Sequence, residues 1–346
     1  MRQLAVLGGA ALLAAVLLLA VVALAGFDAP AALQALWRGA FGSRDAWLSG
    51  TLVRATPLAL TGLAIVVAFR AGVLNIGAEG QFLAGAGVAT AVALATASWG
   101  PVSLLAALLG GVVGGAAIAG IATVLRLSFG VLEVISTLML NFVAQYVVAW
   151  VVRGPLQEPT HIYPQSASLE MASRLPILLP GTRLHLGVLV AVALALGLAW
   201  WLAQTAAGFR LRATGLNAAA AASAGGISVS RVTAGAFLAS GALAGLAGAI
   251  EVTGVTYALY DNLSPGYGFT AIAVALLAGL APGVVLLTAL LFGALEAGAT
   301  AMQRDAGVPS VLVAVVEAVL ILVLVLVERG RRAGWFTSDT TGEDPS

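Results

Sequence analysis

The chain has 346 residues, of which 61% are hydrophobic and 9% are charged. Soluble domains average about 45–50% apolar and about 25% charged residues. Sixteen arginines and fifteen acidic residues leave a net charge of +1, which argues against nucleic-acid binding through phosphates. The absence of Lys and Cys excludes a P-loop, a Schiff-base lysine, thiol catalysis and cysteine metal sites. With only two histidines as well, we expect no metal and no cofactor, and the composition indicates an integral membrane protein.

Apolar runs that can cross a bilayer recur along the chain, since about 20 helical residues span its hydrocarbon core of about 30 Å. The runs predict ten transmembrane helices, at 4–26, 52–69, 76–96, 103–125, 133–152, 185–204, 233–254, 269–281, 283–302 and 310–328. The first run is too long for a signal peptide, so we expect it to be retained. The run at 269–281 is short, and together with 283–302 it forms either two spans or a broken, re-entrant element.

The fold class is therefore all-α, a polytopic membrane protein. Residues 1–330 are expected to form one transmembrane domain, and 331–346 a polar tail. An even number of spans places both termini on one side, with nine arginines on that side and seven on the other. This positive-inside bias predicts cytoplasmic termini. Trp99 and Trp150 then lie at outer ends of spans, and Trp200 and Trp201 at an inner end, as in an interfacial belt.

Three connections between the predicted spans are long. Residues 27–51 carry Trp37 and Trp47 and are expected to form an interfacial helix. Residues 153–184 contain five prolines, which predicts a loop. The inside segment 205–232 begins as a predicted loop and continues with an alanine run that Asn217 can cap as a short helix.

The arginine-flanked inside segment is either a docking element for a soluble partner or a surface loop that carries the positive-inside charge. Its candidate coupling residues are Arg210, Arg212, Gly215, Asn217, Ala221 and Gly225.

Polar residues at membrane depth are costly and indicate either packing or a pathway. Asn75 can cap the helix that follows it, and Glu79 lies favourably at that helix's start. Glu133, Thr137 and Asn141 advance by four residues and so share one helix face. The first group is either a capped helix start or part of a ligand path, and the second is either interhelical bonding or a pathway lining. The candidate pathway residues are Asn75, Glu79, Gln81, Glu133, Thr137 and Asn141.

Small residues spaced by four predict close helix packing, because lipid tails provide no hydrophobic drive for helices to associate. The chain has 42 glycines. The candidate packing residues are Gly110, Gly114, Gly241, Gly245 and Gly248.

Five segments carry a resemblance to a known family. They are 70–81 (RAGVLNIGAEGQ), 129–141 (FGVLEVISTLMLN), 212–217 (RATGLN), 240–248 (SGALAGLAG) and 266–277 (GYGFTAIAVALL). In this order they resemble permease subunits of ATP-binding-cassette (ABC) importers for nucleosides and simple sugars, in the ribose/branched-chain-amino-acid permease superfamily. Five alanines follow Asn217, where relatives often carry acidic or bulkier residues.

The resemblance implies a non-catalytic subunit in a bacterial inner membrane. It implies three protein partners: a cytoplasmic ATPase, a second permease that is homologous or identical, and an extracytoplasmic substrate-binding lipoprotein. It also implies inverted pseudo-repeat halves at about 52–152 and 233–328. The segment 209–227 would then dock into the ATPase.

One alternative from a different class is an ion-coupled secondary transporter of a small polar solute. Such a transporter needs a site for its coupling ion, and Glu79 with Asn75 is the one candidate that the sequence offers. A dependence of uptake on ATP rather than on an ion gradient separates the two functions.

Overall fold

The computed structural model describes residues 16–17, 19–309, 311–312, 314–315 and 318. These residues form helices, turns and one long loop, and the only extended pairings among them are three isolated β-bridges. They belong to two compact units. One unit is built from residues 38–297, and the other from the described residues before 38 and after 297.

The helices have well-defined bounds in chain order. They are α2 (Ala29–Phe41), the π-helix η1 (Ala46–Thr51), α3 (Leu52–Arg70), α4 (Ala78–Ala95), the 3-10 turn η2 (Ala97–Trp99), α5 (Val102–Phe129), α6 (Glu133–Val152), the 3-10 turn η3 (Met171–Ser173), α7 (Gly187–Gln204), α8 (Ala206–Leu216), α9 (Ala218–Gly225), α10 (Val229–Glu251), the π-helix η4 (Val252–Thr256), α11 (Tyr267–Leu277) and α12 (Pro282–Ala306).

Seven helical segments of the described residues are long and apolar enough to cross a membrane. They are 46–70, 78–95, 102–129, 133–152, 187–204, 229–256 and 282–306, and each overlaps a predicted span. The helix α11 is shorter, as the sequence predicts. The chain is thus a polytopic helical membrane protein. The predicted span 310–328, most of 4–26 and the tail 331–346 lie outside the described residues, so the total of ten stays a prediction.

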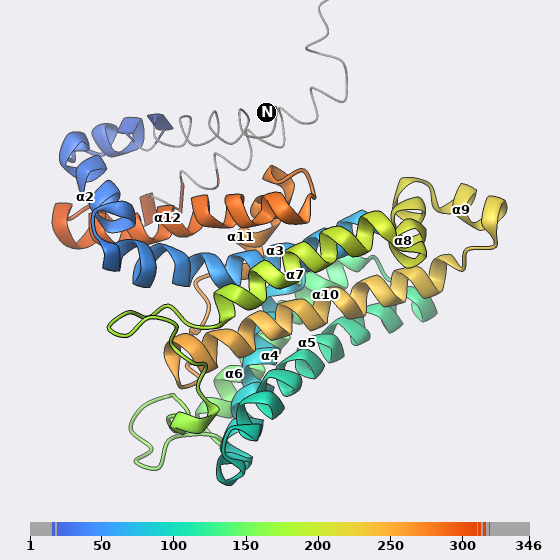
Figure 1. Cartoon of the computed structure of the whole chain (residues 1–346), viewed down its shortest axis with the longest axis horizontal. Coiled ribbons are helices and arrows are strands. Elements are labelled where there is room, and N and C mark those ends of the chain that lie inside the picture. The colour runs from blue at the N-terminus through green and yellow to red at the C-terminus, as the bar shows by residue number, and fades with distance from the viewer. Residues whose placement is uncertain (1–15, 18, 310, 313, 316–317, 319–346) are drawn as a thin grey trace, which may run out of the picture. The chain divides into compact units, whose positions relative to one another are not determined.

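The unit of residues 38–297 is organised around α10, which packs against α3, α4 and α5 (Figure 1). Glycines allow this close approach. A Cβ atom added to Gly245 would overlap the Gly111 carbonyl oxygen and lie 2.8 Å from the Gly115 Cα. A Cβ atom on Gly85 of α4 would overlap the backbone of Gly245 in turn. Three helix backbones therefore meet at one place where no side chain fits.

The five glycines proposed for packing all lie where helices meet. Gly110 and Gly114 face Val88 and Val92 of α4, and a Cβ atom on Gly114 would lie 2.8 Å from the Ala84 carbonyl oxygen. The other three belong to α10. Gly241 and Gly245 approach α5, and Gly248 approaches the backbone of α4.

The predicted loop at 153–184 is confirmed, since η3 is its only helical turn. Hydrogen bonds hold it along the segment that follows α10. Leu175 N donates to Thr253 O (2.8 Å), Leu169 N to Tyr257 O (2.8 Å), and Ser166 N to Leu259 O (2.9 Å). Figure 1 shows this loop at one end of the bundle of α5, α7 and α10, and α8 and α9 at the opposite end.

The second unit has a small apolar core of its own. Val22, Ala32 and Ala35 from its N-terminal part pack with Ala299, Met302 and Val308 from its C-terminal part. The residues 27–51 are mostly helical, in α2 and η1, and their predicted place at the membrane interface stays a prediction.

The contact between α4, α5 and α10 predicts a strong effect of a small change. Replacing Gly245 by Val should push the helices apart, because the new side chain has no space. Overpacking typically costs about 1–3 kcal/mol, and we expect the free energy of unfolding to fall by about 3 kcal/mol or more. A thermal-unfolding series on the purified chain in detergent measures this. Gly197→Val is the matched control, because a Cβ atom there meets nothing within 4 Å. Equal unfolding temperatures for the two variants would show that the contact does not limit stability.

Candidate functional site

The connection between α3 and α4 is a partly buried turn with unusual backbone geometry. Its residues 71–77 are not helical, and Gly72 has a φ of +75°. Asn75 at its centre has no exposed surface. Asn75 Nδ2 donates to Gln81 Oε1 (2.9 Å) and to Ser240 Oγ (2.9 Å), while Asn75 Oδ1 accepts from Gly77 N (2.9 Å) and from Gln81 Nε2 (3.1 Å). All four of its hydrogen bonds are thus internal, and the side chain ties the turn to α4 and α10.

Asn75 was expected to cap α4, and that detail is wrong. The N-cap of α4 is Gly77, which has no side chain to accept a bond. Asn75 lies two residues earlier and supports the turn rather than the helix end.

The face of α6 that carries Thr137 and Asn141 closes the other side of this turn. Asn141 Oδ1 accepts from Gly80 N (2.8 Å), and Asn141 Nδ2 donates to Ile76 O (2.9 Å). Thr137 Oγ1 accepts from Ile76 N (3.2 Å). Both side chains are buried. They therefore supply hydrogen bonds to backbone groups that the turn and the start of α4 leave open.

Glu79 and Glu133 point elsewhere. Glu79 is buried, and its Oε2 accepts from Gly268 N (2.7 Å) at the start of α11. A Cβ atom on Gly268 would overlap Glu79 N, so the two helix starts are in direct backbone contact. Glu133 instead forms an ion pair with Arg126 near the end of α5. The candidate pathway residues thus divide, with Asn75, Gln81, Thr137 and Asn141 in one network, and Glu79 and Glu133 on its flanks.

Sequence reasoning missed two members of this arrangement. Ser240 stands in one of the segments that carry the family resemblance, but a lone serine beside glycines gives no signal of a buried partner. Gly268 contributes only a backbone N–H, which no pattern of side chains can indicate.

A second group of polar residues lies at the loop end of the bundle. Glu251, at the end of α10, is buried within electrostatic range of Arg183 and Arg54. Arg183 lies in the long loop, and its Nη2 donates to Val255 O (3.2 Å). His185 is fully buried, and burial together with the charge of Arg183 lowers its pKa to about 4. His185 is therefore neutral near pH 7. The hydrogen bond of Arg183 to Val255 attaches this end of the loop to η4.

The inside segment consists of two short helices, so the predicted loop at its beginning is wrong. Thr205 caps α8, accepting a bond from Gly208 N (3.0 Å), and Leu211 is buried. This cap and this burial outweigh the unfavourable glycines. The expected short helix after Asn217 is confirmed as α9. Asn217 Oδ1 accepts from Ala220 N (3.0 Å), and Gly226 ends the helix with a φ of +59°.

The helix α8 rests directly on the turn that precedes Asn75. A Cβ atom on Gly215 would overlap the Arg70 carbonyl oxygen and lie 2.9 Å from Gly72 N. Arg70 Nε also donates to Leu280 O (3.0 Å) in the turn between α11 and α12. Of the other candidate coupling residues, Arg210 and Asn217 are exposed, Arg212 is half-buried and Ala221 is buried. Gly225 is the last residue of α9.

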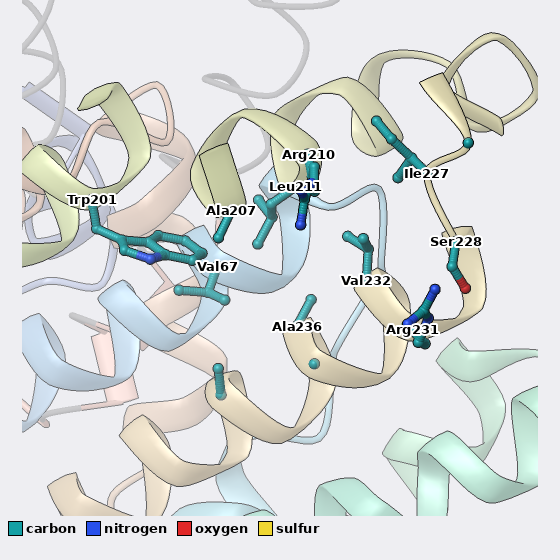
Figure 2. A pocket seen from close by; sticks show the side chains of 13 residues that line it. Val67, Trp201, Ala207, Arg210, Leu211, Ile227, Ser228, Arg231, Val232 and Ala236 are labelled. Carbon is teal, nitrogen blue, oxygen red and sulfur yellow. The ribbon is translucent and has the colours of Figure 1, made fainter. Parts of the chain in front are cut away.

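A cavity of about 520 Å³ lies beside α8 (Figure 2). It is lined by residues of α3, α7, α8 and α10 and of the link between α9 and α10. Val67, Leu211, Val232 and Ala236 form an apolar wall, and Arg210 and Arg231 come from two different helices.

The comparisons with known proteins identify the family. Residues 47–327 match the family model for the branched-chain amino acid transport system / permease component. The chain is 40% identical over 299 residues to the glucose ABC transporter permease protein TsgB13 of Haloferax volcanii, covering 82% of this chain and 77% of that protein. It is 39% identical over 308 residues to the guanosine ABC transporter permease protein NupP of Bacillus subtilis, covering 87% of both.

A third relative is the nucleoside ABC transporter permease protein NupB of Lactococcus lactis, at 33% identity over 282 residues, which covers 78% of this chain and 77% of that protein. No solved structure matches the chain. The matched range includes the turn at 71–77, the face of α6 and both short helices. The chain belongs to the permease component family of the branched-chain amino acid transport systems.

Proposed function

We propose that this chain is the membrane subunit of an ABC importer and forms the path for a nucleoside or a simple sugar. The observation that carries the proposal is an identity of 39–40% to the guanosine and glucose permeases over more than four fifths of the chain. An extracytoplasmic binding lipoprotein delivers the substrate, and a second permease subunit completes the path. ATP is hydrolysed in a separate cytoplasmic subunit, because this chain has no lysine for a nucleotide-binding P-loop.

The proposed place of the chain is a bacterial inner membrane, with ten spans and cytoplasmic termini. In this orientation α8 and α9 face the cytoplasm, and the loop at 153–186 faces outward. The exposed Trp99 and Trp150 at the loop end of the bundle and the exposed Trp200 at the other end support two interfacial belts. The segments 52–152 and 233–328 are the proposed inverted halves.

The function has a direct test. Vesicles that contain the permease subunits and their ATPase, supplied with the binding protein and no ion gradient, should take up labelled guanosine or glucose only when ATP is present. ATP drives the closure of the partner subunits, and this chain supplies the path. Uptake that needs a proton or sodium gradient and no ATP would instead establish the secondary transporter.

The proposed path runs along the network around Asn75 and the Asn141 face of α6. These buried polar groups join α4, α6 and α10, and Glu79 joins α4 to α11. Rearranging the network would move four helices at once, which is what a switch from an outward-facing to an inward-facing cavity needs.

Glu79→Gln separates a role in transport from one in packing. The glutamine keeps one oxygen that can accept from Gly268 N and removes the charge, and its NH2 group replaces the second oxygen of a carboxylate that also bonds with Ser264. We expect ATP-driven uptake to fall severalfold at an unchanged unfolding temperature. Asn141→Ala should lower uptake as well, but it also leaves two buried backbone groups unpaired, at a cost of about 1–3 kcal/mol each.

Gln145→Ala is the matched control for Asn141→Ala. It truncates an amide of the same helix that is exposed and not part of the network. Wild-type uptake in both Glu79→Gln and Asn141→Ala would assign these residues to packing alone.

The proposed coupling surface is formed by α8 and α9. Closure of the ATPase would push α8 against the turn at 71–77 through the contact of Gly215 with Arg70 and Gly72. That turn carries Asn75, so the force reaches the network without a flexible linker. An ion pair of the exposed Arg210 would add only about 0–1 kcal/mol, so shape should dominate docking.

Two substitutions test the coupling. Ala219→Asp places a charge on an exposed position of α9 and should lower recovery of the ATPase in a pull-down severalfold. Gly215→Ala, which forces α8 away from Arg70, should leave the ATPase bound but uncouple hydrolysis from uptake. Ser230→Asp, at an exposed position of α10, is the charge control. Unchanged recovery and unchanged coupling in both test variants would exclude α8 and α9 from this role.

A further inference from the structure

We infer that the cavity beside α8 binds an anionic phospholipid of the membrane leaflet that α8 and α9 face. The inference depends on the membrane-spanning helices and goes beyond the proposed transport function, since it does not involve the transported substrate. Three properties of the cavity carry it: its charge, its apolar depth and its place at the end of the spans.

The charge of the cavity fits an anionic head group. Arg210 on α8 and Arg231 on α10 both line it, and both are exposed. Neither forms an ion pair within the described part of the chain, and of the described residues that line the cavity none is acidic. Two unpaired guanidinium groups with no nearby carboxylate favour a ligand with a phosphate, which arginine binds through several N–H donors.

The depth of the cavity favours a lipid over a side chain of a protein partner. The lining begins at the link before α10 and reaches Ala239, ten residues after the first residue of α10. Ten helical residues correspond to about 15 Å. Val67, Leu211 and Val232 line this length with aliphatic surface, as Figure 2 shows. A cavity with this length and lining has room for part of an acyl chain.

The position of the cavity suits both the acyl chain and the head group of the lipid. Val67 and Ala236 belong to the candidate spans 46–70 and 229–256, and Ala236 lies further into its span than Arg231, so the apolar wall extends inward from the arginine. Trp201 lines the cavity and its neighbour Trp200 is exposed, and tryptophans of this kind mark the head-group level. The head group would then contact Arg210, five residues before Gly215, which rests on Arg70. A bound lipid would therefore brace α8 against α10.

The test uses the full-length chain in phosphatidylcholine vesicles that contain phosphatidylglycerol with a photoreactive acyl chain. We expect label on residues 229–239 after illumination. An arginine near an anionic membrane surface contributes about 1 kcal/mol, or roughly fivefold in affinity. The double variant Arg210→Gln/Arg231→Gln should accordingly lower the labelling by roughly 25-fold. Arg44→Gln, which removes an exposed arginine away from the cavity, should leave it unchanged.

A second variant tests the cavity without changing charge. Gly235 lines the cavity, and a Cβ atom there meets nothing within 4 Å, so Gly235→Phe can begin a side chain without a clash and should occupy part of the cavity. We expect it to abolish the labelling, whereas Gly197→Phe, at an equally open position on α7, should not. If Gly235→Phe does not fold, the arginine variant decides the matter.

Two results would overturn the proposal. The first is equal labelling by phosphatidylglycerol and by photoreactive phosphatidylcholine in the unmodified chain. The second is unchanged labelling in the arginine variant. If that variant keeps its labelling but recovers less ATPase, the two arginines bind the ATPase and the cavity is not an anionic lipid site.

Discussion

The non-helical turn between α3 and α4 is the constraint on which the rest of the structure depends. Inside a membrane protein, a backbone group that leaves a helix must find its hydrogen bond within the protein. Here Asn75 supports its own turn, and Asn141 and Thr137 reach across from α6 to Ile76 and Gly80. The chain therefore folds only if α6 and α10 lie on either side of this turn, and the network fixes which helices are neighbours.

Close packing of small residues makes that network possible. The backbones of α4, α5 and α10 meet at Gly85, Gly111 and Gly245, and this contact brings Ser240 within 2.9 Å of Asn75. Larger side chains would move α10 outward and break the bond. The glycines and the polar network thus depend on each other: the glycines allow a short distance between the helices, and the hydrogen bonds of the network form only at that distance.

The same turn connects the two ends of the transport cycle in the proposed function. Its first residues contact α8 through Gly215, and its last residues carry the network that joins α4, α6 and α10. In the proposed function, a displacement of α8 would reach the hydrogen-bond network of Asn75 directly, because the backbone contact of Gly215 and the network lie on the same short turn.

The sequence by itself determined the membrane class, the positions of the apolar helices, the Pro-rich loop and the helix after Asn217, because length, hydropathy and capping are local properties. It did not determine the partners of the polar residues. Asn75 binds Ser240, 165 residues away, and Glu79 binds a backbone group 189 residues away. The helix α8 was missed because its stability depends on burying Leu211 against the spans. Only the tertiary structure decided these points, since packing alone brings distant residues into contact.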